Sequence, residues 1–266
     1  MLKVDKVRKK QAAFCYVADY LWGGFATLGV SAVFVALWQW GSHSLGEFLL
    51  PSPLVVFRQA LELLQNFKQN QLDISLWRAI IGVGGALILG LSIGFIAGSF
   101  RTIMTMLKPL ITVLLATPPI IWVVMALFWF GFGNASVLFT IMIIVTPLTF
   151  ASAAVGISSM NKQTAEIFTA YKLGFAKKMC YFYLPHLTAY VISGVSVALA
   201  TGVRVVVMAE LLGATDGIGA KIVDARTMLE TPTVIAYVVL IIGLVSLFDY
   251  LIIKPLEILF MPWKQK

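Results

Sequence analysis

Charged residues are scarce in this chain. Only 12% of its 266 residues are Asp, Glu, Lys or Arg, whereas 60% are hydrophobic and the mean hydropathy is +0.92. A soluble domain has about a quarter of its residues charged, and disordered segments are poor in the Val, Ile, Leu and Phe that dominate here. The composition therefore excludes both classes and predicts an integral membrane protein surrounded by a lipid bilayer.

Cysteine, histidine and the common catalytic motifs are also nearly absent. Cys15 and Cys180 lie far apart and His43 and His186 are isolated, so neither a disulfide framework nor a metal site is indicated. The chain contains neither a Gly-x-x-x-x-Gly-Lys-Ser/Thr phosphate-binding loop nor a Gly-x-Ser-x-Gly nucleophile elbow. We therefore expect no enzymatic activity, no metal and no cofactor, and we interpret His186 as a polar residue at the membrane interface.

The hydrophobic residues occur in blocks long enough to cross a bilayer. A transmembrane helix needs roughly 20 predominantly apolar residues. The segment 54–67 carries Arg58 and Glu62 and is predicted as a short helix at the membrane surface. The sequence predicts an all-α membrane protein with an N-terminal tail (1–19), a six-helix transmembrane domain (20–253) and a C-terminal tail (254–266). The six predicted spans are 20–41, 75–100, 109–130, 135–158, 186–212 and 233–253.

The distribution of basic residues predicts the orientation. Most of the 20 Lys and Arg residues fall on the side of the predicted membrane domain that holds the N-terminus. Loops rich in Lys and Arg stay in the cytoplasm, so both termini are expected there, together with both cysteines. The same rule accounts for the net charge of +8, so nucleic acid is not expected as a partner.

Small residues recur every four positions in the second predicted span. Such a stripe lets another helix backbone approach closely. The partner is a helix of the same bundle or, alternatively, a helix across a subunit boundary. The third predicted span contains Pro118-Pro119, which removes two backbone donors and is expected to kink the helix. The stripe consists of Gly82, Ala86, Gly90, Gly94 and Gly98.

Polar residues inside the fifth predicted span need a reason, because an ionisable group at the centre of a membrane helix costs about 2.5–3.5 kcal/mol or more. Ser193, Ser196 and Arg204 share a narrow stripe, which we interpret as lining a water-filled path that favours polar or anionic solutes. Alternatively, Arg204 pairs with Glu210 of a neighbouring copy or with Asp249. Glu210 itself is predicted to act in gating or to hold the loop 213–219.

The predicted inner segment 159–185 separates the fourth and fifth spans. Apolar residues recur at helical spacing within it. A short amphipathic helix of this kind either lies on the lipid surface or inserts into a groove of a partner protein. The residues that form this face are Ile167, Phe168, Tyr171 and Phe175.

The stretch from Glu166 to Gly174, followed by Tyr183-Leu-Pro185, resembles the cytoplasmic "EAA" loop of ABC-type importer permeases. Further stretches, from about residue 50 to the C-terminal end, are similar to the nitrate/sulfonate/taurine-type family. They are Leu50-Pro51-Ser52-Pro53, Ser75-Leu-Trp-Arg-Ala-Ile-Ile-Gly82, Trp129-Phe-Gly-Phe-Gly133, Glu210-Leu-Leu-Gly-Ala-Thr-Asp-Gly-Ile-Gly219 and Asp224-Ala-Arg226.

This resemblance implies a type I ABC importer-like transmembrane domain in the cell (inner) membrane. It implies three kinds of partner: two cytoplasmic ATP-binding subunits that hydrolyse ATP, an extracytoplasmic solute-binding protein, and a second permease copy. In the coupling loop Ala170 and Gly174 match the family pattern best. Phe168 stands where the family usually has glutamate, Glu166 lies two residues earlier, and Pro185 follows Gly174 sooner than usual.

The function expected from the sequence is therefore that of the transmembrane permease subunit of an ATP-driven, binding-protein-dependent importer. An ion-coupled secondary transporter is the alternative. That class often contains inverted repeats and buried carboxylates near the middle of the membrane, and this sequence has neither a clear repeat nor a central Asp or Glu.

Overall fold

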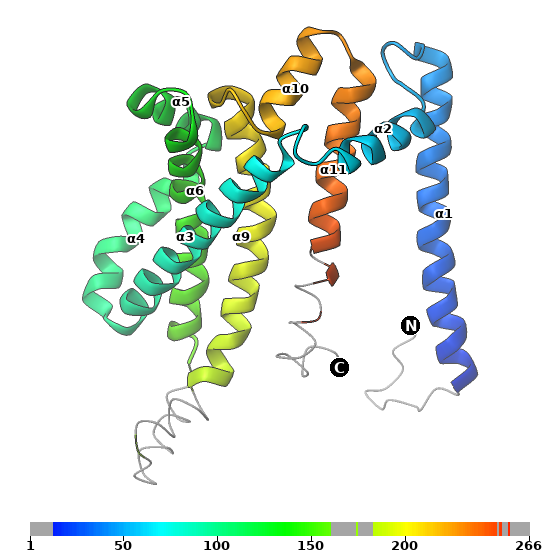
Figure 1. Cartoon of the computed structure of the whole chain (residues 1–266). Coiled ribbons are helices and arrows are strands. Elements are labelled where there is room, and N and C mark those ends of the chain that lie inside the picture. Colours follow the sequence, from blue (N-terminus) through cyan, green and yellow to red (C-terminus); the bar gives the residue numbers. More distant parts are fainter. Residues whose placement is uncertain (1–12, 161–173, 175–182, 249, 252–254, 256–266) are drawn as a thin grey trace. The chain divides into compact units, whose positions relative to one another are not determined.

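A computed structural model describes residues 13–160, 174, 183–248, 250–251 and 255, of which residues 13–28 and 248 are described by their backbone alone. All regular structure in these residues is helical (Figure 1). The chain divides into two units, residues 1–58 and 59–266. The described helices are α1 (Ala13–Leu45), α2 (Pro53–Gln65), α3 (Leu72–Ser99), α4 (Arg101–Ala116), α5 (Pro119–Phe130), α6 (Asn134–Ser158), α9 (Leu184–Gly213), α10 (Ile218–Thr227) and α11 (Thr231–Phe248).

The first unit consists of α1 and the beginning of α2. Helix α1 has 33 residues and extends beyond the predicted span 20–41 at both ends. The connection to α2 turns at Gly46, whose φ is +86°. The indole N–H of Trp38 donates to the carbonyl of Pro51 at 3.1 Å, which ties the connection back to α1. Helix α2 agrees with the predicted short helix 54–67.

The centre of the second unit is the packing of α3 against α6, with α9 alongside (Figure 1). A Cβ atom on Gly90 would lie 2.6 Å from the carbonyl oxygen of Thr146, and one on Gly94 would lie 2.6 Å from that of Phe150. The hydroxyl of Thr149 donates to the carbonyl of Ala86 at 3.1 Å. The stripe of small residues on α3 therefore packs within the chain, as the first of the two alternatives predicted.

A hydrophobic core joins α3, α5, α6 and α9. Its residues are aliphatic and almost fully buried, so within this core the helices are held by dispersion and close packing. Val83 of α3, Val123 of α5, Ile141 of α6 and Val206 of α9 are examples.

The prediction of one kinked helix over 109–130 is wrong. Two helices, α4 and α5, meet there at an angle of 97°. Thr117 and Pro118 both have extended backbone, with ψ of 126° and 135°, and α5 starts at Pro119. A residue before proline is driven out of the helical region, and proline cannot donate to the preceding turn. Two consecutive prolines thus end one helix and start another rather than bending one.

Among the described residues, three helices are long and apolar enough to cross a membrane, namely α3, α6 and α9. The bent pair α4–α5 would add a fourth if it forms one span. Their bounds lie close to the predicted 75–100, 135–158 and 186–212. Helix α11 is apolar but has only 18 residues. The count of six spans and the cytoplasmic location of both termini remain predictions.

Candidate functional site

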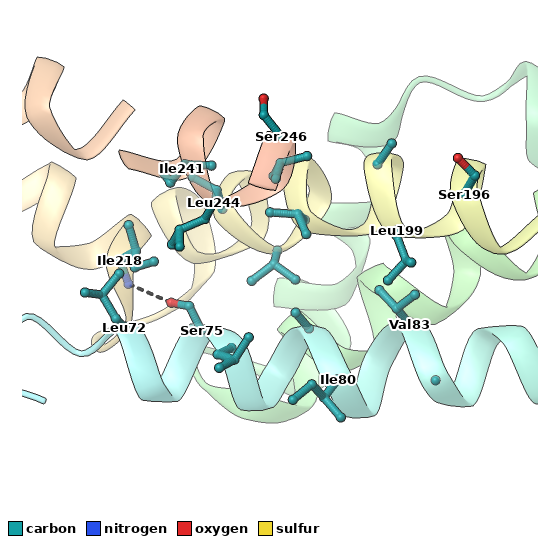
Figure 2. A pocket seen from close by; sticks show the side chains of 18 of the residues that line it. Leu72, Ser75, Ile80, Val83, Ser196, Leu199, Ile218, Ile241, Leu244 and Ser246 are labelled. Atoms are coloured by element: carbon teal, nitrogen blue, oxygen red, sulfur yellow. Dashed lines mark hydrogen bonds between the residues drawn. The ribbon is translucent and has the colours of Figure 1, made fainter. Parts of the chain in front are cut away.

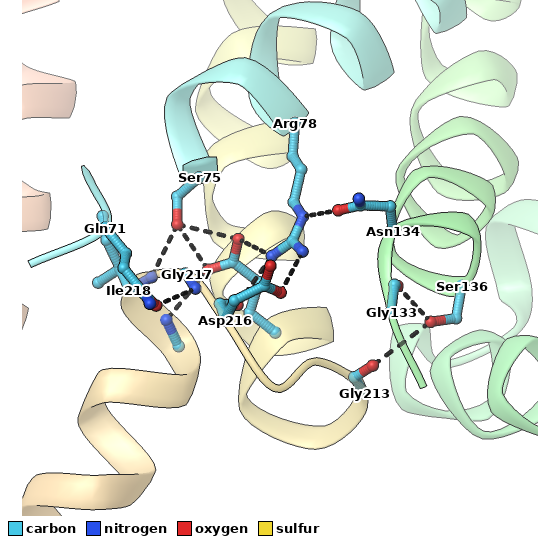
Figure 3. Close-up of polar contacts among 12 residues, drawn as sticks. Gln71, Ser75, Arg78, Gly133, Asn134, Ser136, Gly213, Asp216, Gly217 and Ile218 are labelled. Carbon is cyan, nitrogen blue, oxygen red and sulfur yellow. Dashed lines mark hydrogen bonds and ion pairs between the residues drawn. The ribbon is translucent and has the colours of Figure 1, made fainter. Parts of the chain in front are cut away.

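A network of charged and polar side chains lies where the ends of several helices meet. Ser75, Arg78 and Glu210 are its buried members, whereas Asp216 is 38% exposed. The network contains the start of α3, the start of α6, the end of α9 and the loop that leads into α10 (Figure 3). The residues come from positions as far apart in sequence as Arg78 and Asp216. Its charged members are Arg78, Glu210 and Asp216.

Arg78 is the only cation of this network and is 2% exposed. Its Nη1 donates to Glu210 Oε1 at 2.9 Å and to the backbone carbonyl of Asp216 at 2.8 Å. Its Nη2 forms an ion pair with the Asp216 carboxylate, and its Nε donates to Asn134 Oδ1 at 2.7 Å. All three guanidinium nitrogens have acceptors. This is the condition under which a buried arginine is tolerated, because an unpaired buried charge is strongly destabilising.

Glu210 is fully buried and anchors the loop before α10. Its carboxylate accepts from the Ser75 hydroxyl, at 2.7 and 2.9 Å, and from the Gly219 backbone N–H at 3.0 Å. The Ser75 oxygen in turn accepts from the Ile218 N–H at 2.8 Å. These N–H groups belong to the first turn of α10, where an anion is favoured by the unsatisfied amides and the helix dipole.

Glycine is required where the loop approaches Glu210. Gly217 has φ of +99°, and a Cβ atom there would lie 2.5 Å from Cδ of Glu210. A Cβ atom on Gly219 would lie 2.6 Å from the backbone nitrogen of Leu211. The Glu210…Gly217-Ile-Gly219 pattern thus reflects a close approach of backbone to carboxylate, which only residues without a side chain permit.

Two further hydrogen bonds connect the network to the residue before α3 and to the α5–α6 connection. Gln71 adopts φ of 56°, a left-handed conformation that is uncommon outside glycine, and its side-chain oxygen accepts from the Gly217 N–H at 2.8 Å. The Gly133 N–H, in the α5–α6 connection, donates to the Gly213 carbonyl at the end of α9 at 2.9 Å. The network therefore ties four helix ends into one hydrogen-bonded body.

A cavity of about 520 Å³ lies next to this network, between α3, α9, α10 and α11 (Figure 2). Its wall is almost entirely aliphatic, with Val83, Leu199 and Leu244 among the side chains that point into it. Ser75 lies in the wall and donates outward to Glu210, so its hydroxyl is not free for a ligand.

The structure separates the residues of the predicted polar path. Ser196 is half-buried and lines the cavity, whereas Ser193 and Arg204 are exposed and do not. Glu210 does not line the cavity either, because the network encloses it. Its hydrogen bond to Gly219 agrees with the predicted role of holding the loop 213–219.

The structure does not bring Arg204 together with Glu210. Within the described residues Arg204 forms neither a hydrogen bond nor an ion pair. The carboxylate of Glu210 is already engaged by Arg78 and Ser75 of its own chain, which removes the reason to seek a partner in a neighbouring copy. The other suggested partner, Asp249, lies outside the described residues.

The coupling-loop residues are only partly described. Glu166, Phe168 and Ala170 lie outside the described residues. Gly174 is described and exposed, and Pro185 lies in the first turn of α9.

Sequence reasoning missed Arg78 and Asp216. Arg78 lies near the start of the predicted span 75–100, where a basic residue is common, although it is one of the most buried side chains in the described part of the chain. A signal was present: Ser75 and Arg78 are three residues apart and share a helix face. Both also belong to a stretch that resembles the permease family.

Comparison with known proteins agrees with this resemblance. Residues 86–252 match the family model described as "binding-protein-dependent transport system inner membrane component", which covers more than half of the chain. The chain belongs to this permease family. Glu210 and Asp216 lie inside the matched range, whereas Ser75 and Arg78 precede it, so the network joins the family domain to the segment before it.

Several known permeases align with most of this chain. The taurine transport system permease protein TauC of Escherichia coli is 26% identical, over 89% of this chain and 90% of its own length. The nitrate import permease protein NrtB of Synechococcus elongatus is 30% identical over 73% of both chains. The formylaminopyrimidine transport permease protein ThiX of Halalkalibacterium halodurans is 25% identical, over 87% of this chain and 93% of its own. The chain is thus a multi-pass membrane transport permease.

Proposed function

We propose that this chain is the transmembrane subunit of an ATP-driven importer that carries a small polar or anionic solute into the cell. It works in the inner membrane with two cytoplasmic ATP-binding subunits, an extracytoplasmic solute-binding protein and a second copy of itself. The observation that carries this proposal is the family match over residues 86–252. The relatives named for taurine, sulfonates and nitrate support a solute of this kind.

In this proposal the segment between α6 and α9 transmits the action of the ATP-binding subunits. Glu166, Phe168, Ala170 and Gly174 contact the ATP-binding subunit, and Pro185 marks the return of the chain into α9. Closure of the two ATP-binding subunits then moves the helices between inward- and outward-open states. ATP shifts the equilibrium between the inward- and outward-open states because it binds the two states with different affinity.

The solute path runs along the exposed face of α9. Ser193, Ser196 and Arg204 lie on this helix, and the positive charge of Arg204 attracts anions. The adjoining aliphatic cavity offers few groups that could hold a polar solute, so the proposed path follows the face with Ser193 and Arg204 and not the cavity. Selection among solutes then belongs to the solute-binding protein.

Purification in mild detergent tests the proposal. The chain, expressed with the products of its neighbouring genes, should copurify with an ATPase. Reconstituted vesicles should then accumulate taurine, an alkanesulfonate or nitrate only with ATP and the solute-binding protein. Uptake driven by a proton or sodium gradient in vesicles that contain this chain alone would overturn the proposal and favour a secondary transporter.

A further inference from the structure

The last turn of α6 and the first turn of α9 are joined by a group of polar contacts. The His186 Nε2 atom lies 3.1 Å from the carbonyl oxygen of Gly156 and 3.2 Å from the hydroxyl oxygen of Ser159. With a hydrogen on Nε2, His186 donates to Gly156, since a carbonyl can only accept a hydrogen bond. The Ser159 hydroxyl lies 2.8 Å from that of Tyr190, one turn further along α9.

Close packing accompanies these hydrogen bonds. A Cβ atom on Gly156 would lie 3.0 Å from Cβ of Tyr190 and 3.1 Å from its Cγ, so the tyrosine lies directly on the backbone of α6. The rings of His186 and Tyr190 are four residues apart, and their centroids are 5.3 Å apart. Both side chains of α9 thus face the same turn of α6.

These contacts lie at the two ends of the segment 161–182. The chain leaves α6 at Ser158 and enters α9 at Leu184, so the contacts join the two helix ends to which the intervening segment is covalently attached. Further from the ends the helices are held independently, because Gly194 of α9 packs on Ser152 of α6. Loss of the polar contacts would therefore free the helix ends without separating the helices.

We propose that His186, Ser159 and Tyr190 form a clasp that makes the ends of α6 and α9 move as one body. This inference rests on the proposed function, in which the ATP-binding subunits act on the segment between these ends. The clasp converts that action into a common displacement of both helices. His186 is a positioning residue in this mechanism, and the quantity it controls is the amount of solute moved per ATP hydrolysed.

The test is the ratio of solute uptake to ATP hydrolysis, measured on the complete complex in vesicles with the solute-binding protein. His186→Ala should lower this ratio several-fold while ATP hydrolysis persists. His186→Gln should restore it, because the glutamine amide places an N–H donor near the position of Nε2. Thr188→Ala is the matched control, since its hydroxyl donates to Pro185 within the same turn of α9.

A wild-type ratio in His186→Ala would overturn the clasp, as would equal loss in His186→Ala and His186→Gln. Should His186→Ala fail to assemble, Tyr190→Phe decides, because it removes only the hydroxyl: a lowered ratio supports the clasp and an unchanged ratio overturns it. If the wild-type complex itself shows no uptake that depends on ATP, the proposed function fails and the clasp with it. If uptake by the wild-type complex depends on ATP and the His186 and Tyr190 variants keep the wild-type ratio of uptake to hydrolysis, the clasp is refuted and the proposed function stands.

Discussion

Arg78 is the residue on which the buried network depends, because it is the cation that both Glu210 and Asp216 contact. Its removal would leave a fully buried carboxylate without a counter-charge. Breaking a buried ion pair by removing one partner costs about 3–5 kcal/mol, whereas an exposed pair contributes roughly 0–1 kcal/mol. The two cases can be compared within this chain, since Lys221 and Asp224 form an exposed pair at 3.6 Å.

We therefore expect Arg78→Met to lower the free energy of unfolding by about 3–5 kcal/mol and Lys221→Ala to change it by less than about 1 kcal/mol. Thermal unfolding in detergent, followed by circular dichroism, measures the difference. Adding Glu210→Gln to Arg78→Met should recover part of the loss, because it removes the unpaired charge. Equal melting temperatures for Arg78→Met and Lys221→Ala would contradict this view of the network.

The sequence could not predict this network for a physical reason. Hydropathy and charge counts treat Arg78 as a flanking residue, since they respond only to neighbours along the chain. Its acceptors lie on other elements: Asn134 begins α6, and Glu210 and Asp216 lie near the end of α9. Glu210 could be connected with the loop 213–219 because the two are close in sequence, and that connection is present in the structure.

At the scale of helices, the packing of α3 on α6 depends on the absence of side chains at particular positions. Gly90 and Gly84 allow a matched comparison on one helix. A Cβ atom on Gly90 would collide with Thr149 and lie 2.6 Å from the Thr146 carbonyl, whereas one on Gly84 meets nothing within 4 Å. Overpacking of a close contact costs typically about 1–3 kcal/mol.

Gly90→Ala should therefore destabilise the protein by about 1–3 kcal/mol, while Gly84→Ala should be neutral or slightly stabilising, because alanine favours the helix. Size-exclusion profiles and melting temperatures of the two purified variants give the comparison. Equal stability of the two would show that α3 and α6 do not approach as closely as described.

The bounds of α3, α6 and α9 could be predicted within a few residues because a long apolar block has little alternative to a helix in lipid. The position of the break between α4 and α5 could be predicted from Pro118-Pro119, but the division into two helices could not. Pro109 lies inside α4 without interrupting it, whereas Pro118 and Pro119 turn the chain by 97°. Pro109 is isolated, whereas Thr117 and Pro118 each precede a proline and both have extended backbone.

At the scale of the whole molecule, Arg204 is the cation that the proposed solute path depends on. It is exposed on α9, and the described residues give it no ionic partner. If it lines the solute path, Arg204→Leu should reduce uptake of an anionic solute at least several-fold without loss of assembly, and Arg204→Lys should keep most of the activity. Uptake by the complex in vesicles and its elution volume in detergent are the two readouts. Lost assembly in Arg204→Leu would instead indicate a structural ion pair.

In the proposed mechanism a separate ATPase drives this permease through the segment between α6 and α9. The most direct measurement is solute uptake by a variant in which residues 166–174 are scrambled, compared with the amount of the chain inserted in the membrane. We predict that uptake falls to background while insertion is unchanged. Uptake at the wild-type rate by the scrambled chain would show that this segment does not couple the permease to an ATPase.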